Sequence, residues 1–324
     1  MENNPIKVSV ICLTYNHEKH IARALDGFVN QKTNFAYEVL VHDDCSADGT
    51  ADIIRDYAQR YPDIIKPILQ TVNQYSQGIW IDRDIVAPLA KGRYVAYCEG
   101  DDYWSDPNKL QKQYDFLSAN PSYSACAHKT VFHNMGTGED YLVPSIKKDR
   151  DYSLEEITMV GGSLFGTNSF MVRRELVVDM PDCFLMSGFS DFQLFMYAAM
   201  NGKVRCLNAA MSVYNIGVAG SWTQTMMEDK QRRIHHCQVF IKLLDQIDEY
   251  FAGKYHNLLN KKRREMEYLI LAIEEDCKGM RKPEYFPFYL RDAVASAKGK
   301  LATAFPVLRK IKRWIKGRYN NGKN

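Results

Sequence analysis

Short, nearly continuous apolar runs alternate with amphipathic segments through the first 120 residues. The runs are rich in β-branched residues and end at polar residues, which is typical of strands buried on both faces of a parallel sheet. Between them, apolar residues recur at helical spacing. This alternation predicts βαβ units, and therefore an α/β fold with a mostly parallel sheet flanked by helices. The expected strands are residues 8–13, 38–42, 64–69 and 94–98, and the expected helices include residues 18–31, 53–61 and 110–117.

The pattern changes in the rest of the chain. Residues 120–170 contain glycines at 136, 138, 161, 162 and 166 and are expected to be irregular. Residues 188–200 fit a helix that opens with Ser190-Asp191, and from about residue 226 the segments are long, charged and helical. These shifts predict a domain over residues 1–225 and a helical C-terminal extension over residues 226–324.

The net charge of +3 conceals an asymmetry along the chain. Residues 298–324 contain nine Lys or Arg residues and no acid, so the first 297 residues carry a net charge of −6. An acidic body argues against a nucleic-acid-binding core, and the basic tail is expected to have a separate role. The hydrophobic content of 46% is that of an ordinary globular protein and excludes a disordered or fibrous chain.

Three features predict a cytoplasmic protein. Residues 1–5 lack the basic and apolar regions of a secretory signal, and no run approaches the 18 apolar residues of a membrane span. None of the eight cysteines has the C-x-x-C spacing of zinc or thiol redox sites. A chain of 324 residues does not need disulfides for stability, so we expect reduced thiols.

Polar residues follow three of the expected strands, and another acid opens a later helix. In an open parallel sheet, ligands bind beyond the carboxyl ends of the strands. Each group taken alone also fits a turn or a helix cap, but their occurrence together favours a binding site. They are Thr14, Tyr15 and Asn16 after the first strand, Asp43 and Asp44 after the second, Asp101 and Asp102 after the fourth, and Asp191 in the later helix.

The known phosphate-binding loops do not match. No G-x-G-x-x-G follows the first strand, and the segment from Gly161 to Gly166 is followed by Thr167 where a P-loop requires lysine. Carboxylates repel a diphosphate directly. They bind it through a divalent cation, and Mg²⁺ or Mn²⁺ needs only one or two carboxylates plus phosphate oxygens. The pair Asp101-Asp102 fits that requirement.

Three segments together resemble a known enzyme family. They are residues 8–16 (VSVICLTYN), 38–50 (EVLVHDDCSADGT) and 92–104 (GRYVAYCEGDDYW). In this order and spacing they resemble the family 2 glycosyltransferases of the GT-A fold, inverting enzymes of bacterial polysaccharide synthesis. The resemblance covers roughly the first 120 residues and implies a Rossmann-like GT-A sheet.

The resemblance also implies roles for individual residues. The family usually has an acidic residue directly before the general base, and this sequence has Ser190 at that position. The Q-x-x-R-W element of processive synthases is absent, which favours transfer of one sugar per encounter. His17 and His20 are more typical of surface or capping residues than of ligands. The implied roles are nucleotide binding for Thr14, Tyr15, Asn16, Asp43 and Asp44, with Asp44 on the base; contact with the donor ribose or sugar for Asp101; Mn²⁺ or Mg²⁺ ligation for Asp102; and general base for Asp191.

The implied activity is metal-dependent, inverting, non-processive transfer of a hexosyl group. The expected donor is a UDP-sugar, and the expected acceptor is a hydroxyl group of a lipid-linked saccharide in bacterial surface polysaccharide synthesis. Two alternatives stay open. A sugar nucleotidyltransferase would need a glycine-rich basic loop after the first strand, and residues 14–20 supply none. A catalytically inactive homologue serving as an assembly subunit would be favoured by loss of Asp102 or Asp191, and both acids are present.

The basic tail has an amphipathic pattern. Within residues 300–318, apolar residues including Trp314 share one face of an expected helix, and basic residues cover the rest. A cationic amphipathic helix with a tryptophan fits an anionic membrane interface. We therefore expect the protein to lie on the cytoplasmic face of a membrane through this segment, although a solvated basic tail is the alternative.

Overall fold

The structure is a computed structural model that describes residues 5–186, 190–217 and 229–294. By the density of internal contacts, the chain divides into two units. The first contains residues 1–228 and 249–252, and the second contains residues 229–248 and 253–324. The assignment of residues 1–225 to a glycosyltransferase domain and of residues 226–324 to an extension stays a prediction.

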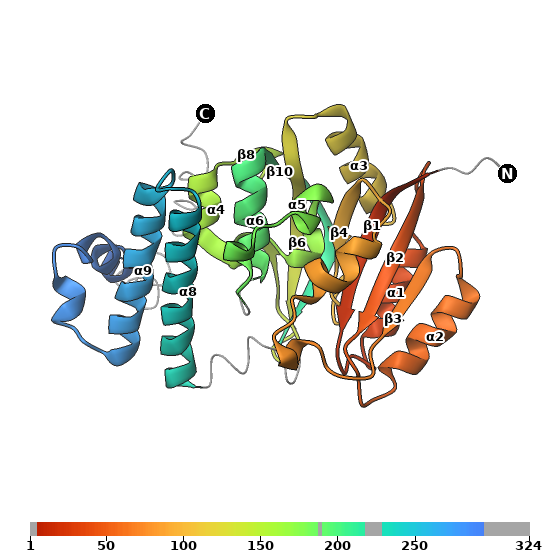
Figure 1. The fold of residues 1–324 in the computed structure, drawn as a ribbon, viewed down its shortest axis with the longest axis horizontal. Helices are drawn as coiled ribbons and strands as arrows, with labels where there is room; N and C mark the ends of the chain where they lie inside the picture. The colour runs from red at the N-terminus through yellow and green to blue at the C-terminus, as the bar shows by residue number, and fades with distance from the viewer. Residues whose placement is uncertain (1–4, 187–189, 218–228, 295–324) are drawn as a thin grey trace, which may run out of the picture. The chain divides into compact units, whose positions relative to one another are not determined.

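Four parallel strands form the N-terminal half of the sheet in the first unit, in the order β3-β2-β1-β4 (Figure 1). Each expected strand and helix of this half is present, with ends displaced by a few residues. The sheet is therefore built from the predicted βαβ units. The elements are β1 (Ile6–Thr14), α1 (Ile21–Val29), β2 (Ala36–Asp43), α2 (Thr50–Arg60), β3 (Ile65–Leu69), β4 (Tyr94–Tyr97) and α3 (Lys109–Ala119).

The other half of the sheet is mixed, and the expectation of an irregular segment over residues 120–170 is wrong. Strand β9 is antiparallel to both β4 and β6, whereas the long strands β6 and β10 pair in parallel. The sheet order continues from β4 as β9-β6-β10-β5, with β7 on β6 and β8 on β10. The elements are β5 (Tyr103–Trp104), β6 (Tyr123–Asn134), β7 (Asp140–Val143), β8 (Arg150–Tyr152), α4 (Leu154–Val160), β9 (Met171–Arg173), α5 (Glu175–Val178), α6 (Ser190–Asn201) and β10 (Lys203–Ile216).

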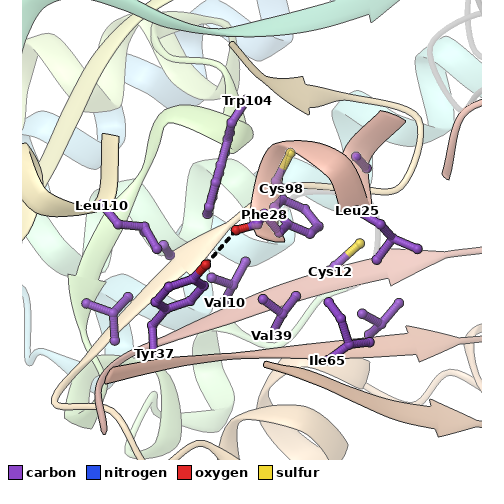
Figure 2. Close-up of a cluster of buried hydrophobic side chains, with 14 of the residues drawn as sticks. Val10, Cys12, Leu25, Phe28, Tyr37, Val39, Ile65, Cys98, Trp104 and Leu110 are labelled. Carbon is purple, nitrogen blue, oxygen red and sulfur yellow. Dashed lines mark hydrogen bonds between the residues drawn. The ribbon is translucent and has the colours of Figure 1, made fainter. Parts of the chain in front are cut away.

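A large hydrophobic cluster lies between the parallel strands and helices α1, α2 and α3. Figure 2 shows the ring of Phe28 among side chains of β1 and β2 and that of Cys98, with Trp104 close by. The Tyr37 hydroxyl donates to the carbonyl oxygen of Phe28 over 2.8 Å and so satisfies a buried polar atom within the cluster.

Alternation along β1 separates this core from a cavity. Val10 and Cys12 point into the hydrophobic cluster, whereas Ile11 and Leu13 line a cavity on the other face of the sheet. The same alternation in β4 sends Ala96 into the cluster, and Tyr97 lines the cavity. Residues of one strand therefore build both the core and the wall of a candidate site.

The second unit contains most of α8 (Lys230–Tyr250) and all of α9 (His256–Glu274). Within this unit, α9 carries a buried ion pair between Lys262 Nζ and Glu265 Oε2 at 2.9 Å. Among the helices that the structure describes, none has the length and apolar character needed to cross a membrane. The tail at residues 300–318 lies outside the described residues.

Candidate active site

The loops that follow β1 and β2 are joined by hydrogen bonds. Thr14 Oγ1 donates to Asp43 Oδ1 over 3.1 Å, and the N–H of Asn16 donates to Ser46 Oγ over 2.8 Å. Asn16 Oδ1 accepts in turn from the N–H of Ala47 over 2.8 Å. Asn16 has a φ of 56°, in the left-handed region that asparagine enters more readily than most residues. The carboxyl ends of these two neighbouring strands therefore form one well-supported edge.

Asp44 supports the loop that follows β3. Its carboxylate is buried and accepts the N–H of Gln74 at Oδ1 over 2.7 Å and the N–H of Tyr75 at Oδ2 over 3.1 Å. Its carbonyl oxygen accepts from Asn73 Nδ2 over 3.1 Å. Because each carboxylate oxygen has two acceptor sites, Asp44 retains capacity for a further donor such as a base N–H.

Asp102 is 2% exposed and is held from two sides. Its Oδ1 accepts the N–H of Asn215 over 2.8 Å, and its Oδ2 accepts Asn168 Nδ2 over 3.0 Å. Burial raises the pKa of Asp102, and the neighbouring carboxylates of Asp101 and Glu99 raise it further. Two hydrogen bonds therefore hold this carboxylate, and with it the loop, in place.

Asn168, which sequence reasoning did not single out, is the hub of this support. Its side chain is fully buried, and Oδ1 accepts Ser212 Oγ over 2.8 Å and Thr130 Oγ1 over 3.3 Å. Nδ2 also donates to the carbonyl oxygen of Val213 over 2.9 Å. The Asn168 carbonyl oxygen accepts Trp104 Nε1 over 2.9 Å. Asn168 thus connects the loop that carries Glu99, Asp101 and Asp102, called the acidic loop below, to the long strands β6 and β10.

Asp101 is the more accessible acid of the pair, with 20% of its side chain exposed. His17, expected to be a surface or capping residue, instead has its Nε2 4.0 Å from Asp101 Oδ2. Burial lowers the pKa of His17, and the charge of Asp101 opposes this shift. Between these elements, Gly100 is required because a Cβ there would lie 2.6 Å from Thr14 Cγ2. The acidic loop therefore packs directly against the loop after β1.

A cavity of about 120 Å³ borders the acidic loop, and three carboxyl groups line it. They belong to Asp82, Glu99 and Asp191. Burial raises the pKa of Asp191 to about 6, opposed by a hydrogen bond with the Thr167 side chain. Burial also raises the pKa of Asp82 to about 6, with a smaller contribution from the charge of Asp191. A carboxylate with such a pKa is a stronger base near neutral pH than an ordinary aspartate.

The structure gathers most of the predicted residues into two adjoining groups. Thr14, Asn16, Asp43 and Asp44 lie where β1 and β2 end, and the loop of Asp101 and Asp102 packs against them through Gly100. Asp191 shares its cavity with Glu99, two residues before Asp101. Tyr15 differs, because its ring is 49% exposed. Two acids of the cavity, Asp82 and Glu99, were not singled out from the sequence.

The acidic loop fits a cation that is completed by its ligand. Among the described residues, no three His, Cys, Asp or Glu side chains are grouped to hold a metal ion. One or two carboxylates are enough for Mg²⁺ or Mn²⁺ when phosphate oxygens supply further ligands. The accessible carboxylate of Asp101, adjoining the buried Asp102, provides oxygen donors of the right kind.

The sheet order and the acids at its carboxyl edge define a GT-A-like enzyme fold. The chain belongs to glycosyl transferase family 2, whose family profile matches residues 9–180. The resemblance inferred from the three sequence motifs is thereby confirmed.

The curated relatives are bacterial proteins. An uncharacterized protein of Mycobacterium tuberculosis, Rv1520, is 35% identical over 215 residues, which is 66% of this chain and 60% of that protein. The putative teichuronic acid biosynthesis glycosyltransferase TuaG of Bacillus subtilis is 34% identical over 177 residues, 54% of this chain and 66% of that protein. The chain thus spans about three fifths of the length of the first of these relatives.

Two solved structures share the fold. TarS of S. aureus in complex with UDP has a TM-score of 0.58 at 20% identity, and the match covers 88% of this chain and 78% of the TarS chain. The mannosyltransferase PcManGT of Pyrobaculum calidifontis, in complex with GDP-Man and Mn²⁺, has a TM-score of 0.57 at 18% identity, with 95% and 83% coverage. At these identities the likeness shows the fold, and the predicted GT-A architecture is confirmed.

Proposed function

We propose that the protein transfers a hexosyl group from a UDP-sugar to a hydroxyl group of a saccharide acceptor, one sugar per encounter and with inversion. The observation that supports this most is the junction of three features at one edge of the sheet. A well-supported polar edge, an acidic loop and a half-buried carboxyl group with a raised pKa adjoin there. Membership of glycosyl transferase family 2 agrees with this chemistry.

The donor nucleotide is assigned to the edge formed by the loops after β1 and β2. Thr14, Tyr15, Asn16 and Asp43 would line it, and Asp44 would accept a hydrogen bond from the base. The buried position of Asp44 supports this role, because a preorganised carboxylate with spare acceptor capacity discriminates between bases at little entropic cost. UDP is the ligand in the TarS complex named above, which supports uracil as the base.

Asp191 is assigned as the general base. Inversion requires the acceptor oxygen to attack the anomeric carbon from the face opposite the leaving diphosphate, and its proton must be taken as the new bond forms. The carboxylate of Asp191 would hold that proton. Its pKa of about 6 makes this transfer easier than for an ordinary aspartate while leaving most of the group ionised at neutral pH.

The acidic loop is assigned to Mn²⁺ or Mg²⁺. When bound, such a cation neutralises charge on diphosphate oxygens. We propose that Asp101 and Asp102 serve it together. Asp101 is the carboxylate with exposed surface, and Asp102 is held in position by hydrogen bonds from Asn168 and Asn215. The binding of Mn²⁺ by PcManGT supports a cation in this fold.

The acceptor is assigned to the lipid-linked saccharides of a bacterial surface polysaccharide. The named role of TuaG in teichuronic acid biosynthesis supports the pathway class. A cytoplasmic, membrane-peripheral location through residues 300–318 would bring the enzyme to such an acceptor. In the described part of the chain, Phe286, Leu290 and Val294 precede this segment as exposed apolar residues spaced four apart. An apolar stripe that continues toward a basic tail fits an anionic membrane surface.

The test is release of UDP from UDP-sugars with Mn²⁺, in the presence and absence of saccharide acceptors. Asp191→Asn should lower turnover by about 100-fold or more and change UDP-sugar affinity by only a few-fold, because proton transfer occurs only in the transition state. Wild-type kcat/KM should fall about tenfold per pH unit below about pH 6, where Asp191 is protonated.

The same experiment separates the alternatives. Unchanged turnover of Asp191→Asn would refute the assignment of the base. An inactive assembly subunit would bind UDP and release none from any donor. A sugar nucleotidyltransferase would instead form UDP-sugar and pyrophosphate from UTP and a sugar phosphate.

A further inference from the structure

The cavity beside the acidic loop has an unusual combination of walls. Its lining includes the aromatic side chains of Trp80 and Tyr75 as well as the carboxyl groups of Asp82, Glu99 and Asp191. These acids come from three separate elements: the short helix η2 (Ile81–Val86), the loop after β4, and α6. The chain therefore brings three carboxyl groups to the lining of one cavity, where burial raises the pKa of each of them.

Two polar atoms at this cavity have no hydrogen-bond partner among the described residues. The Tyr97 side chain lines the cavity at 5% exposure, and its hydroxyl is buried and unpartnered. Glu99 Oε2 is also buried and unpartnered. The charges of Asp82, Asp191 and Glu99 raise the pKa of Tyr97 beyond the effect of burial, which places its hydroxyl near all three acids. Buried polar atoms are nearly always satisfied, so both atoms have hydrogen-bonding capacity that a ligand with hydroxyl groups could use.

The walls define what that ligand can be. Aromatic faces suit the C–H surface of a sugar ring, and carboxyl and phenol groups suit its hydroxyls. The cavity of about 120 Å³ has room for a sugar ring. A carboxylate on the sugar would enter a site that already holds three acids, and a site discriminates strongly through such like-charge contacts.

We propose that Asp82 is a specificity-determining residue, which with Glu99 and Asp191 makes this cavity accept an uncharged hexosyl ring and reject a uronic acid. This inference rests on the proposed function. The ring can be that of the donor or that of the acceptor, since both meet beside Asp191 during transfer. Asp82 is the member that the proposed chemistry does not otherwise use, and its substitution therefore isolates specificity from proton transfer.

The donor arm of the test is equilibrium binding of UDP, UDP-glucose and UDP-glucuronate by calorimetry in the presence of Mn²⁺. Wild type should bind UDP-glucuronate about tenfold or more weakly than UDP-glucose. Asp82→Asn keeps the size of the side chain and should reduce that ratio by about threefold to tenfold, with the affinity for UDP unchanged. Asp84→Asn is the matched control, because Asp84 lies two residues away, is exposed and does not line the cavity; its ratio should equal that of wild type.

The acceptor arm compares stimulation of UDP release by an alkyl glucoside and by the matching glucuronide. The proposal is supported if wild type prefers the neutral sugar in either arm and if Asp82→Asn, but not Asp84→Asn, reduces that preference. The arm in which this occurs shows whether the ring belongs to the donor or to the acceptor. Equal use of charged and neutral sugars by wild type in both arms would overturn it. So would a preference that Asp82→Asn leaves unchanged. Failure to bind UDP would instead contradict the proposed function.

Discussion

Lys109, the first residue of α3, is a fully buried cation beneath the loop that carries the acids. Its ammonium donates to Gln113 Oε1 over 2.8 Å and lies 4.0 Å from the centre of the Trp104 ring. Gln113 in turn donates to the carbonyl oxygens of Cys126 and Ser169 over 2.7 and 2.8 Å. Lys109 therefore belongs to the scaffold that supports Trp104 and, through it, Asn168.

The size of the effect follows from the pKa. Burial lowers the pKa of Lys109 from 10.5 to about 7, while nearby Cys98 and Cys126 oppose the shift. Between these two values the unfolded chain binds a proton that the folded chain has lost, so the contribution of Lys109 to stability rises with pH by about 1.4 kcal/mol per pH unit. The difference between a pKa of 10.5 and one of about 7 corresponds to a loss of about 5 kcal/mol in the free energy of unfolding. This loss is present in full below pH 7 and is absent above pH 10.5.

The perturbation is Lys109→Met, which keeps a long side chain and removes the charge. Urea unfolding of wild type and variant at about pH 7.5, 8.5 and 9.5 measures both free energies of unfolding. The free energy of unfolding of the variant minus that of wild type should fall by about 3 kcal/mol from about pH 7.5 to 9.5, because wild type gains stability as Lys109 loses its proton. Loss of the bond to Gln113 costs roughly 1–3 kcal/mol at every pH and leaves this trend unchanged.

A control on the same helix tests the reasoning. Lys112 pairs with Asp106 at 2.6 Å, and its side chain is 48% exposed. Lys112→Met should change the free energy of unfolding by less than about 1 kcal/mol at each pH. A difference between wild type and Lys109→Met that stays constant from pH 7.5 to 9.5 would refute the assignment of a buried, titrating ammonium.

Three further predictions concern the acidic loop and the tail. Asn168→Ala should lower the free energy of unfolding by roughly 3–5 kcal/mol in urea, because several buried partners lose a hydrogen bond; a loss under 1 kcal/mol would show that Asn168 is not the hub described. Asp101→Asn and Asp102→Ala should each weaken the Mn²⁺-dependent part of UDP binding, and EDTA should reproduce this in wild type. Only Asp102→Ala should also destabilise the fold, since Asp101 is the accessible acid, and full activity in EDTA would remove the cation from the mechanism. Deletion of residues 300–324 should abolish salt-sensitive co-sedimentation with anionic vesicles and preserve activity on a soluble acceptor; equal binding by the truncated protein would contradict the membrane assignment.

The N-terminal half of the fold was predictable because its strands are buried on both faces. Residues 8–13 are apolar except for Ser9, residues 39–41 are an apolar run, and these segments form β1 and β2 with ends close to those expected. Such runs arise only where helices cover both sides of a sheet. The polar residues that follow each run could therefore be placed at one edge from sequence alone.

The strand β6 was missed because half of its buried positions are polar. Ser124, His128 and Thr130 are all buried, although a polar residue in a short segment usually indicates exposure. Thr130 is buried because it donates to Asn168, and Ser124 because it donates to the carbonyl oxygen of Ala198 over 2.7 Å. The hydrogen bonds that stabilise such a strand join segments far apart in the sequence, so they cannot be predicted from the pattern of hydrophobic residues.

The same limit explains which site residues were found. The motif acids stand beside strand ends, so their position follows from local pattern. Asn168 and Asp102 are 66 residues apart in the sequence, and Asn215 is 113 residues from Asp102. Asp82 follows no strand, and only the folded chain brings it to the cavity of Asp191. Motifs thus supply most of the charge, whereas Asn168, outside every motif, holds that charge in place, and Asp82, also outside them, is proposed to select the substrate. Substitutions at Asn168 and Asp82 should therefore reveal more about this particular enzyme than substitutions of the motif acids.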